Sequence, residues 1–380
     1  MSTTSLQSHL ANANDMSSGI KEMIKEKGNT CVSIIMPTHR LGQDRQGDHK
    51  EVQKAVLAAK QLIPGEQKKI LNGIDELVEQ IDFNRNKDAV GIFVSLHFQK
   101  LVKFPFPCTK KVSVRESFLL SDLLYLENYS IPYYVLDISK KEIHLFQGIM
   151  DHLEEMISNN FPRKIIDDYE YARPSQSSSI AGYSHVKSFE KDKTELQYLR
   201  LEKIFREADK GLRNYLITKE IPLVLCGPER DISLYKSVTK FSDNIAASMS
   251  DSYRAAAVHN LEDLAWLQVK SFIDNQKSKL IEEFEEKIGA GVAVYGMEEV
   301  WDAAQEGKGF KLLVEKDYSR MAFVTQSGKL TKHHPVEKHV MVPDVINEII
   351  TTVLEKNGKV IVVAKNALTD HKRLALINRY

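Results

Sequence analysis

The segment YYVLDISKKEIHLFQG, residues Tyr133–Gly148, holds two apolar runs separated by a polar dipeptide. The first run covers Tyr133–Ser139, the second covers Glu142–Gln147, and Lys140-Lys141 lies between them. Two such runs joined by a short polar connection predict a β-hairpin. This hairpin decides the fold of the middle of the chain, because the elements after it are predicted to pack against it.

The residues after the hairpin complete one predicted domain over residues 131–255. Apolar residues at helical spacing predict a helix over residues 193–216, and a short apolar run ended by Gly-Pro predicts a buried strand over residues 222–228. A loop over residues 171–190 separates the hairpin from the helix. Its first part, YARPSQSSSIAGYSH (Tyr171–His185), has five serines and almost no aliphatic residue. This composition is typical of a loop that reaches a partner, and equally of a linker.

The N-terminal part of the chain is predicted to be a flexible tail, residues 1–29, followed by an α/β domain, residues 30–130. The domain opens with the buried strand CVSIIMP (Cys31–Pro37), which is rich in β-branched residues. Two helices follow, and then a pair of strands over Ala89–Ser95 and Lys100–Phe104. The alternation of strands and helices indicates an α/β domain.

The C-terminal part, residues 256–380, is predicted to be a small α/β/α sandwich that begins with a linking helix. The linking helix is predicted to end near residues 289–291, where glycines occur. A helix, two strands, a second helix and a third strand follow. Pro343 in the first turn of the second helix and Gly358 just after it are the expected start and stop signals. The last eight residues are expected to form a tail.

Composition limits the class of protein. With 42% hydrophobic and 27% charged residues, the chain is typical of a globular rather than a disordered protein. The formal net charge is zero, so the total charge does not require a nucleic acid. No apolar run is long enough for a membrane span, and the N-terminus has neither the basic start nor the apolar core of a signal peptide. The protein is expected to be cytoplasmic, with its three cysteines reduced and buried.

No motif predicts an enzyme, a metal site or a cofactor. The glycine-containing segment GAGVAVYG (Gly289–Gly296) precedes its strand, whereas a phosphate-binding loop lies between a strand and a helix. His333 and His334, with His339 nearby, have no acidic or cysteine partner at ligand spacing, and we interpret them as a polar hairpin tip. Asp137 is a single carboxylate in a strand, and no nucleophile stands beside a base.

One loop concentrates cationic side chains between the first strand and the first helix. Such a surface is typical of a contact with RNA phosphates, although a solvated charged surface has the same composition. The candidate RNA-binding residues are His39, Arg40, Arg45, His49 and Lys50.

Three segments in order resemble one family. CVSIIMPTHR, DAVGIFVS and SFLLSDLLYL resemble the N-terminal domain of the archaeal and eukaryotic class-1 release factors and of their relative Pelota, and more closely the bacterial, Balon-like members of that superfamily. The middle unit resembles their ribonuclease H-like second domain. The last unit, down to Arg379-Tyr380, resembles their C-terminal domain, which shares its fold with ribosomal proteins that bind kinked RNA. The resemblance covers about residues 30–380 and implies a multi-domain α/β protein.

The resemblance gives the serine-rich loop an expected role. In true release factors this loop carries Gly-Gly-Gln, and the glutamine backbone positions a water against the peptidyl-tRNA ester. In this chain no glycine pair precedes Gln176, and glycine supplies the backbone freedom that such a tip needs. We therefore expect the loop to contain no catalytic residue. It is expected either to contact the large ribosomal subunit or to be a plain linker. The residues of this expected contact are Gln176, Ser177, Gly182, Tyr183 and His185.

The resemblance implies a non-catalytic ribosome-binding factor that occupies the vacant decoding site, in ribosome hibernation or in rescue. The implied partners are ribosomal RNA of the decoding site and large subunit, and a translational GTPase of the elongation factor Tu type. One alternative is a peptidyl-tRNA hydrolase that uses Gln176 or His185 in a diverged loop. A further alternative is an RNA-binding regulator that uses the C-terminal unit.

Overall fold

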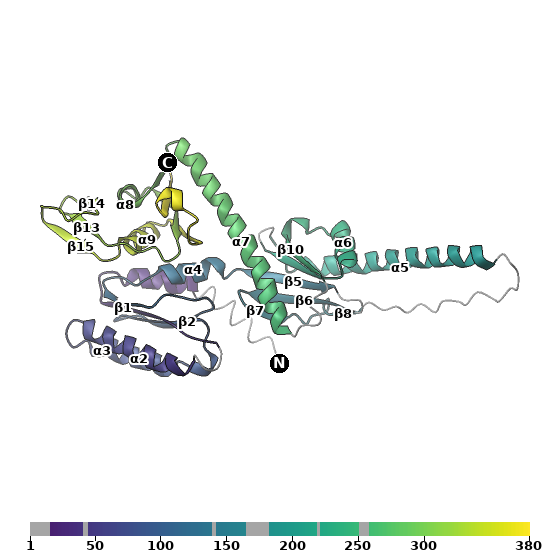
Figure 1. The fold of residues 1–380 in the computed structure, drawn as a ribbon, viewed down its shortest axis with the longest axis horizontal. Coiled ribbons are helices and arrows are strands. Elements are labelled where there is room, and N and C mark those ends of the chain that lie inside the picture. Colours follow the sequence, from purple (N-terminus) through teal and green to yellow (C-terminus); the bar gives the residue numbers. More distant parts are fainter. Residues whose placement is uncertain (1–15, 41–44, 139–141, 165–181, 219–220, 251–257) are drawn as a thin grey trace. The chain divides into compact units, whose positions relative to one another are not determined.

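The computed structural model describes residues 16–40, 45–138, 142–164, 182–218, 221–250 and 258–380 (Figure 1). Residue contacts divide the chain into two compact units. Ile131–Phe272 form the first unit, and the described residues up to Ser130 form the second together with Ile273–Tyr380. Both units combine sheets with helices, so the predicted multi-domain α/β fold class is confirmed.

The sheet of the first unit is mixed, and it contains the predicted hairpin. β5 (Pro132–Ile138) and β6 (Glu142–Ile149) pair antiparallel, with Tyr134 opposite Gln147. The residues between the two strands lie outside the described ones. β9 (Leu223–Gly227) runs parallel to β5 and also to β10 (Ile245–Ser250). β7 (His152–Glu155) and β8 (Arg163–Lys164) pair with β6. These last two strands and β10 are too short and too polar to stand out in the sequence.

One face of this sheet is covered by α6 (Glu229–Val238) and by the C-terminal part of α5 (Gly182–Leu212), whose first turns extend beyond the sheet (Figure 1). Phe205 and Leu212 of α5 and Tyr235 of α6 are buried in one core with the strand residues Leu136 and Leu225. η2 (Ser242–Asn244) precedes β10. α7 (Val258–Gly289) brings Trp266 against Tyr133 of β5, with the ring centroids 6.5 Å apart.

The beginning of α5 corrects the predicted loop over residues 171–190. The helix starts at Gly182, so Gly182, Tyr183 and His185 stand in its first turn and not in a loop. The sequence placed the boundary too late because the serine-rich residues 171–181 suggested a longer loop. The helix therefore begins about eleven residues before Lys193, where the sequence predicted its start.

The second unit begins with an antiparallel sheet in the order β3-β2-β1-β4. Its strands are β1 (Cys31–Pro37), β2 (Ala89–Val94), β3 (Gln99–Phe104) and β4 (Lys111–Arg115). α2 (Arg45–Leu62) and α3 (Lys68–Glu79) cover one face (Figure 1), and η1 (Phe83–Arg85) leads into β2. Ile34 of β1 packs there against Val52 of α2 and Ile74 of α3. β4 was not predicted, because KVSVR is short and half polar.

The predicted flexible tail over residues 1–29 is wrong for its second half. Residues 16–25 are helical, and Met16, Ile20 and Met23 on one side of this helix are buried. Glu26 is buried as well, and its carboxylate accepts a hydrogen bond from Ser95 Oγ at 2.7 Å. Spacings of four and three residues between the apolar side chains are a helical signal, but the polar residues around them obscured it.

The C-terminal sheet of the second unit has the order β11-β17-β12-β16. The strands are β11 (Ala293–Tyr295), β12 (Gly309–Glu315), β16 (Lys359–Val363) and β17 (Leu374–Asn378). β17 lies inside the sheet, which corrects the expected C-terminal tail. The run from Leu374 to Ile377 is apolar throughout because both faces of this strand are buried.

Helices lie on both faces of the C-terminal sheet. α8 (Met297–Gln305) and α9 (Val345–Glu355) pack on one face, and the end of α7 packs on the other through Phe284. η4 (Thr369–His371) precedes β17. A small second sheet consists of β13 (Ala322–Thr325), β14 (Leu330–Thr331) and β15 (His339–Val342). None of the described helices is long and apolar enough to cross a membrane.

Within the second unit, hydrogen bonds join α9 and β16 of the C-terminal part to α4 (Ser121–Tyr129) and the residues just before it. Asn347 of α9 is buried, and its Oδ1 accepts from the backbone N–H of Leu120 at 3.0 Å. Its Nδ2 donates to the carbonyl of Phe118 at 2.8 Å. Asn128 of α4 accepts from the N–H of Val362 at 2.8 Å. These residues are more than 200 positions apart in sequence, so no local pattern predicts the contact.

Candidate nucleic-acid interface

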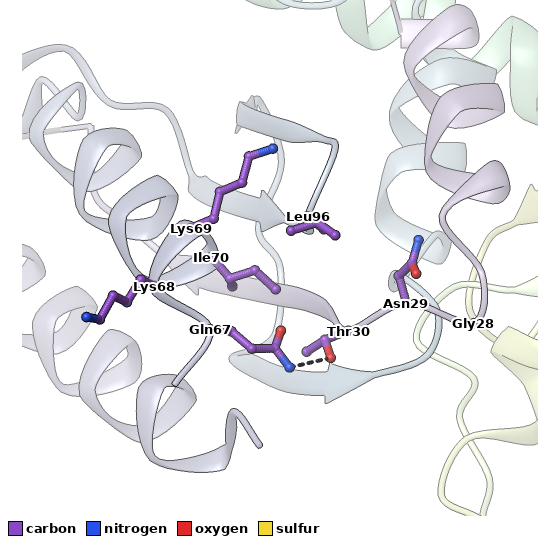
Figure 2. A pocket seen from close by; sticks show the side chains of 8 residues that line it. All are labelled: Gly28, Asn29, Thr30, Gln67, Lys68, Lys69, Ile70 and Leu96. Carbon is purple, nitrogen blue, oxygen red and sulfur yellow. Dashed lines mark hydrogen bonds between the residues drawn. The ribbon is translucent and has the colours of Figure 1, made fainter. Parts of the chain in front are cut away.

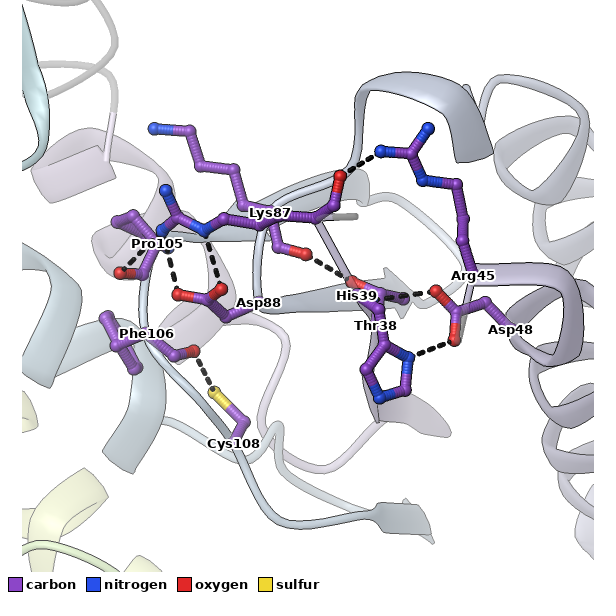
Figure 3. Close-up of polar contacts among 10 residues, drawn as sticks. Thr38, His39, Arg45, Asp48, Lys87, Asp88, Pro105, Phe106 and Cys108 are labelled. Atoms are coloured by element: carbon purple, nitrogen blue, oxygen red, sulfur yellow. Dashed lines mark hydrogen bonds and ion pairs between the residues drawn. The ribbon is translucent and has the colours of Figure 1, made fainter. Parts of the chain in front are cut away.

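The cationic segment begins where β1 ends, and two buried or half-buried contacts fix its path. Thr38 donates its N–H to the carbonyl of Asp88 at 2.9 Å and its Oγ1–H to the carbonyl of Lys87 at 2.7 Å. The N–H of His39 donates to Asp48 Oδ2 at 2.8 Å, and the ring Nδ1 lies 2.7 Å from Oδ1 (Figure 3). Asp48 is buried in the first turn of α2. The end of β1 is thereby tied to the start of the helix.

Both predicted arginines have partners inside the chain. Arg40 forms a bidentate ion pair with Asp88, from Nε to Oδ1 at 2.6 Å and from Nη2 to Oδ2 at 2.8 Å. Nη2 also lies 3.3 Å from the carbonyl of Pro105. Arg45 donates from Nη2 to the carbonyl of Arg40. Asp48 and Asp88 thus offset part of the positive charge that the sequence concentrates in this loop.

The remaining two candidates lie on α2. The ring of His49 packs edge-on against Phe83 at 5.2 Å, and its Nε2 lies 3.2 Å from Gln53 Nε2. Lys50 is exposed and forms no ion pair with an acid in the part of the chain that the structure describes. The structure therefore brings His39, Arg40 and Arg45 together around the start of α2. Among the described residues no acidic partner is found for Arg45, His49 or Lys50, and the last two side chains are exposed.

A hollow of about 480 Å³ lies beside the N-terminal sheet and α3 (Figure 2). Two lysines that the sequence analysis did not name as candidates line it. Lys68 and Lys69 are exposed in the first turn of α3, which contains no acid, and Gln67 makes no side-chain cap. Gln67 instead donates to Thr30 Oγ1 at 3.0 Å. Ammonium groups near the positive end of a helix dipole favour anions. The two adjacent lysines at the start of α3 are visible in the sequence and could have indicated this cationic site. The lining residues are Gly28, Asn29, Thr30, Gln67, Lys68, Lys69, Ile70 and Leu96.

The candidate contact with the large subunit is only partly described. Gln176 and Ser177 lie outside the described residues. Gly182, Tyr183 and His185 belong to the helical backbone at the start of α5. The cationic segment belongs to the other unit.

All three cysteines are buried, and the described residues contain no cluster that could hold a metal ion. Burial and the nearby carboxylate of Glu26 raise the pKa of the Cys31 thiol to about 12, and burial likewise raises the pKa of Cys108. Among the described residues no three histidine, cysteine or acidic side chains are placed to hold a metal ion. His334 and His339 instead pack on each other and on Phe323.

A comparison with protein families identifies the middle of the chain. Residues 132–308 match the model of Bacterial archaeo-eukaryotic release factor family 3. This match confirms the resemblance to the release factor superfamily that the sequence segments indicated. No curated protein matches the sequence.

Several solved structures are similar over most of the chain at low identity. An archaeal translation termination factor, aRF1, is 12% identical over 97% of this chain and 98% of its own, with a TM-score of 0.25. A model of ribosome-bound archaeal Pelota and ABCE1 gives 12% identity, 97% and 94% coverage, and a TM-score of 0.40. Dom34 of S. cerevisiae, described as a translation termination-like factor, is 12% identical over 77% of this chain and 74% of its own, with a TM-score of 0.39.

Proposed function

We propose that this chain, a release-factor-like protein that matches the bacterial archaeo-eukaryotic release factor family over residues 132–308, binds the ribosome and occupies the vacant decoding site without catalysing peptide release. The family match carries the proposal, because it connects the chain to translation. The biological setting is ribosome hibernation or rescue. Co-sedimentation with purified ribosomes, and with lysates from growing and starved cells, tests the binding and distinguishes the two settings.

The absence of catalysis rests on the serine-rich loop. The residues around Gln176 are Ser175 and Ser177, so no glycine pair precedes the glutamine. The first glycine after it, Gly182, begins α5. A backbone that must present a water to an ester needs a fixed and unusual conformation, which serines do not favour.

We extend the proposal to the domain folds and to a second partner. The first unit has antiparallel β5, β6 and β7 continued by parallel β9 and β10, and this order supports a ribonuclease H-like middle domain. The helices on both faces of the C-terminal sheet support the fold of ribosomal proteins that bind kinked RNA. A translational GTPase of the elongation factor Tu type is the proposed delivery partner. A pull-down of the full chain with purified GTPase, in GTP and GDP, tests this partner.

Charge reversal at the exposed lysines is expected to weaken ribosome binding. The change is Lys50→Glu combined with Lys68→Glu and Lys69→Glu. Each lost phosphate contact lowers the slope of log K against log salt by about 0.7–0.9, so the slope should fall by about two to three. Binding is measured by co-sedimentation across a salt series. These lysines are cleaner probes than Arg40 and Arg45, whose side chains also hold the loop together.

The matched control is Lys236→Glu, an exposed lysine near the end of α6. It makes the same Lys→Glu change once, and it lies in the other unit. Unchanged binding of the triple variant across the salt series would exclude this surface as the RNA contact.

Substitution of the loop glutamine is expected to leave function intact. Gln176→Ala should bind ribosomes as well as the parent, because a serine-rich loop makes adaptable contacts that do not depend on one side chain. Tyr183→Ala should loosen binding, since an aromatic ring stacked on an exposed base contributes about 1–3 kcal/mol. Both variants are measured by co-sedimentation and by release of labelled peptide from stalled ribosomes. Peptide release by the parent that disappears in Gln176→Ala would make the protein a peptidyl-tRNA hydrolase instead.

A further inference from the structure

The small sheet of β13, β14 and β15 belongs to the C-terminal part, and one of its faces packs on α8. On this face Leu330 of β14 is 2% exposed, and Lys332, two positions later, forms an ion pair with Glu298 of α8 at 2.9 Å. The indole N–H of Trp301, also on α8, donates to the carbonyl of Gly328 at 3.1 Å. Successive side chains of a strand point to opposite faces, so every second residue of these strands points away from α8.

The strand register shows which side chains share the opposite face. Phe323 of β13 lies opposite Thr331 of β14 and Met341 of β15, and Thr325 lies opposite His339. Residues that lie directly opposite each other on paired strands have their side chains on one face. The two rings and Thr331 are half-buried, and Met341 is 54% exposed. This face is therefore open to solvent where its rings lie.

Three aromatic rings gather on this face. His334, from the connection between β14 and β15, is exposed, and its ring packs against Phe323 at 5.2 Å and against His339 at 4.3 Å between centroids. The Nδ1 of His334 lies 3.1 Å from the carbonyl of Pro335, and the Nδ1 of His339 lies 2.8 Å from the carbonyl of Glu337. These contacts orient the two imidazole rings. Oriented rings on a sheet are the groups on which unstacked nucleic-acid bases stack.

The segment that carries these rings is also cationic. Residues 326–339 contain three lysines and three histidines but one acid, a glutamate. Lys332 is the lysine paired with α8, whereas Lys329 and Lys338 are exposed and form no ion pair within the part of the chain that the structure describes. Ammonium groups beside stacking rings complement a ligand that carries both phosphates and bases. This combination favours a nucleic acid over an apolar protein surface.

We propose that this face of the small sheet binds a short single strand of RNA, whose bases stack on His334 and the rings beside it while its phosphates lie near Lys329 and Lys338. A single strand suits the site because the bases of an RNA duplex are stacked on one another and do not offer their faces. The surface shares no residue with the cationic segment at the start of α2. The proposal does not depend on occupancy of the decoding site.

Titration of labelled decauridylate with the full chain, followed by fluorescence anisotropy, tests the proposal. We expect saturable binding that weakens as the salt concentration rises. An abasic decamer keeps the phosphates but has no base to stack, so it should bind at least about fivefold more weakly, the effect of losing one stacked base. No saturable binding of decauridylate, or equal binding of the abasic decamer, would overturn the proposal. The face would then be a contact for a protein.

The same titration with the charge-reversal variant at Lys50, Lys68 and Lys69 separates this site from the other candidate surface. Decauridylate binding should persist in that variant, because the three changes lie in the N-terminal part of the chain. Loss of decauridylate binding there would place the RNA on the N-terminal surface and overturn the proposal. Ribosome co-sedimentation is scored separately, so failure of one proposal does not decide the other.

Variants of the exposed ring then locate the site. His334→Ala should weaken decauridylate binding by at least about fivefold, and His334→Tyr, which restores a ring, should recover most of it. Lys329→Glu with Lys338→Glu should lower the slope of log K against log salt by about 0.7 for each lost phosphate contact. Tyr380→Ala is the matched control, since it removes a 77% exposed ring that lies outside the small sheet. Unchanged binding in His334→Ala, or a loss that His334→Tyr does not recover, would contradict stacking at this site.

Discussion

Phe284→Ala is expected to lower the free energy of unfolding of the C-terminal part by about 3–5 kcal/mol, the usual cost of truncating a fully buried phenylalanine. The ring is completely buried on the face of the C-terminal sheet opposite α8 and α9. It contacts a core that includes Leu313 and Ile377, and its centroid lies 5.0 Å from the ring of His371. The strands beneath the ring are hydrogen-bonded to one another, so their backbones cannot move far into the cavity that the substitution leaves.

Urea denaturation followed by tryptophan fluorescence measures this effect. The chain has two tryptophans, and Trp266→Phe leaves only Trp301, which is buried in α8. Leu267→Ala is the matched control on the same helix, because its side chain is 57% exposed and its loss should change stability by less than about 0.5 kcal/mol. Equal midpoints for the two variants would mean that the end of α7 is not part of the C-terminal core.

Gly227→Ala is expected to lower stability by about 3 kcal/mol or more. Gly227 ends β9 with φ at +149°, a conformation that side-chain-bearing residues rarely adopt. A Cβ atom there would lie 2.4 Å from the carbonyl oxygen of Ile138, which is fixed in the neighbouring strand. Backbone strain and overpacking therefore add.

The fluorescence of Trp266 in a Trp301→Phe background reports this change, because Trp266 packs on β5 of the same unit. Gly289→Ala is the control, since a Cβ atom added at this helix end would have no neighbouring atom within 4 Å. The stability of this control should be unchanged or slightly raised. A Gly227→Ala variant as stable as the parent would show that β9 and β5 can separate at this end.

The sequence alone predicted the elements whose signals are local. The hairpin of β5 and β6, the buried strands β1 and β9, and the end of α7 at Gly289 follow from apolar runs, glycine and proline. Residues 16–25 and β17 were misread, although both patterns are present in the sequence. Whether such a segment is an exposed tail or a buried element depends on the residues that pack over it. Those residues are distant in the chain, so a local pattern does not reveal them.

The candidate site divides in the same way. The sequence located the cationic loop, since charge is a property of each residue. Only the tertiary structure decided how much of that charge reaches solvent, because Asp88, which pairs with Arg40, is 48 positions away. The hollow beside α3 also exists only in the folded chain, where Gly28 and Leu96 line it together with the start of that helix. Charge and hydrophobic periodicity are properties of the local sequence. Ion pairing of a side chain and its enclosure in a hollow depend instead on packing between remote segments.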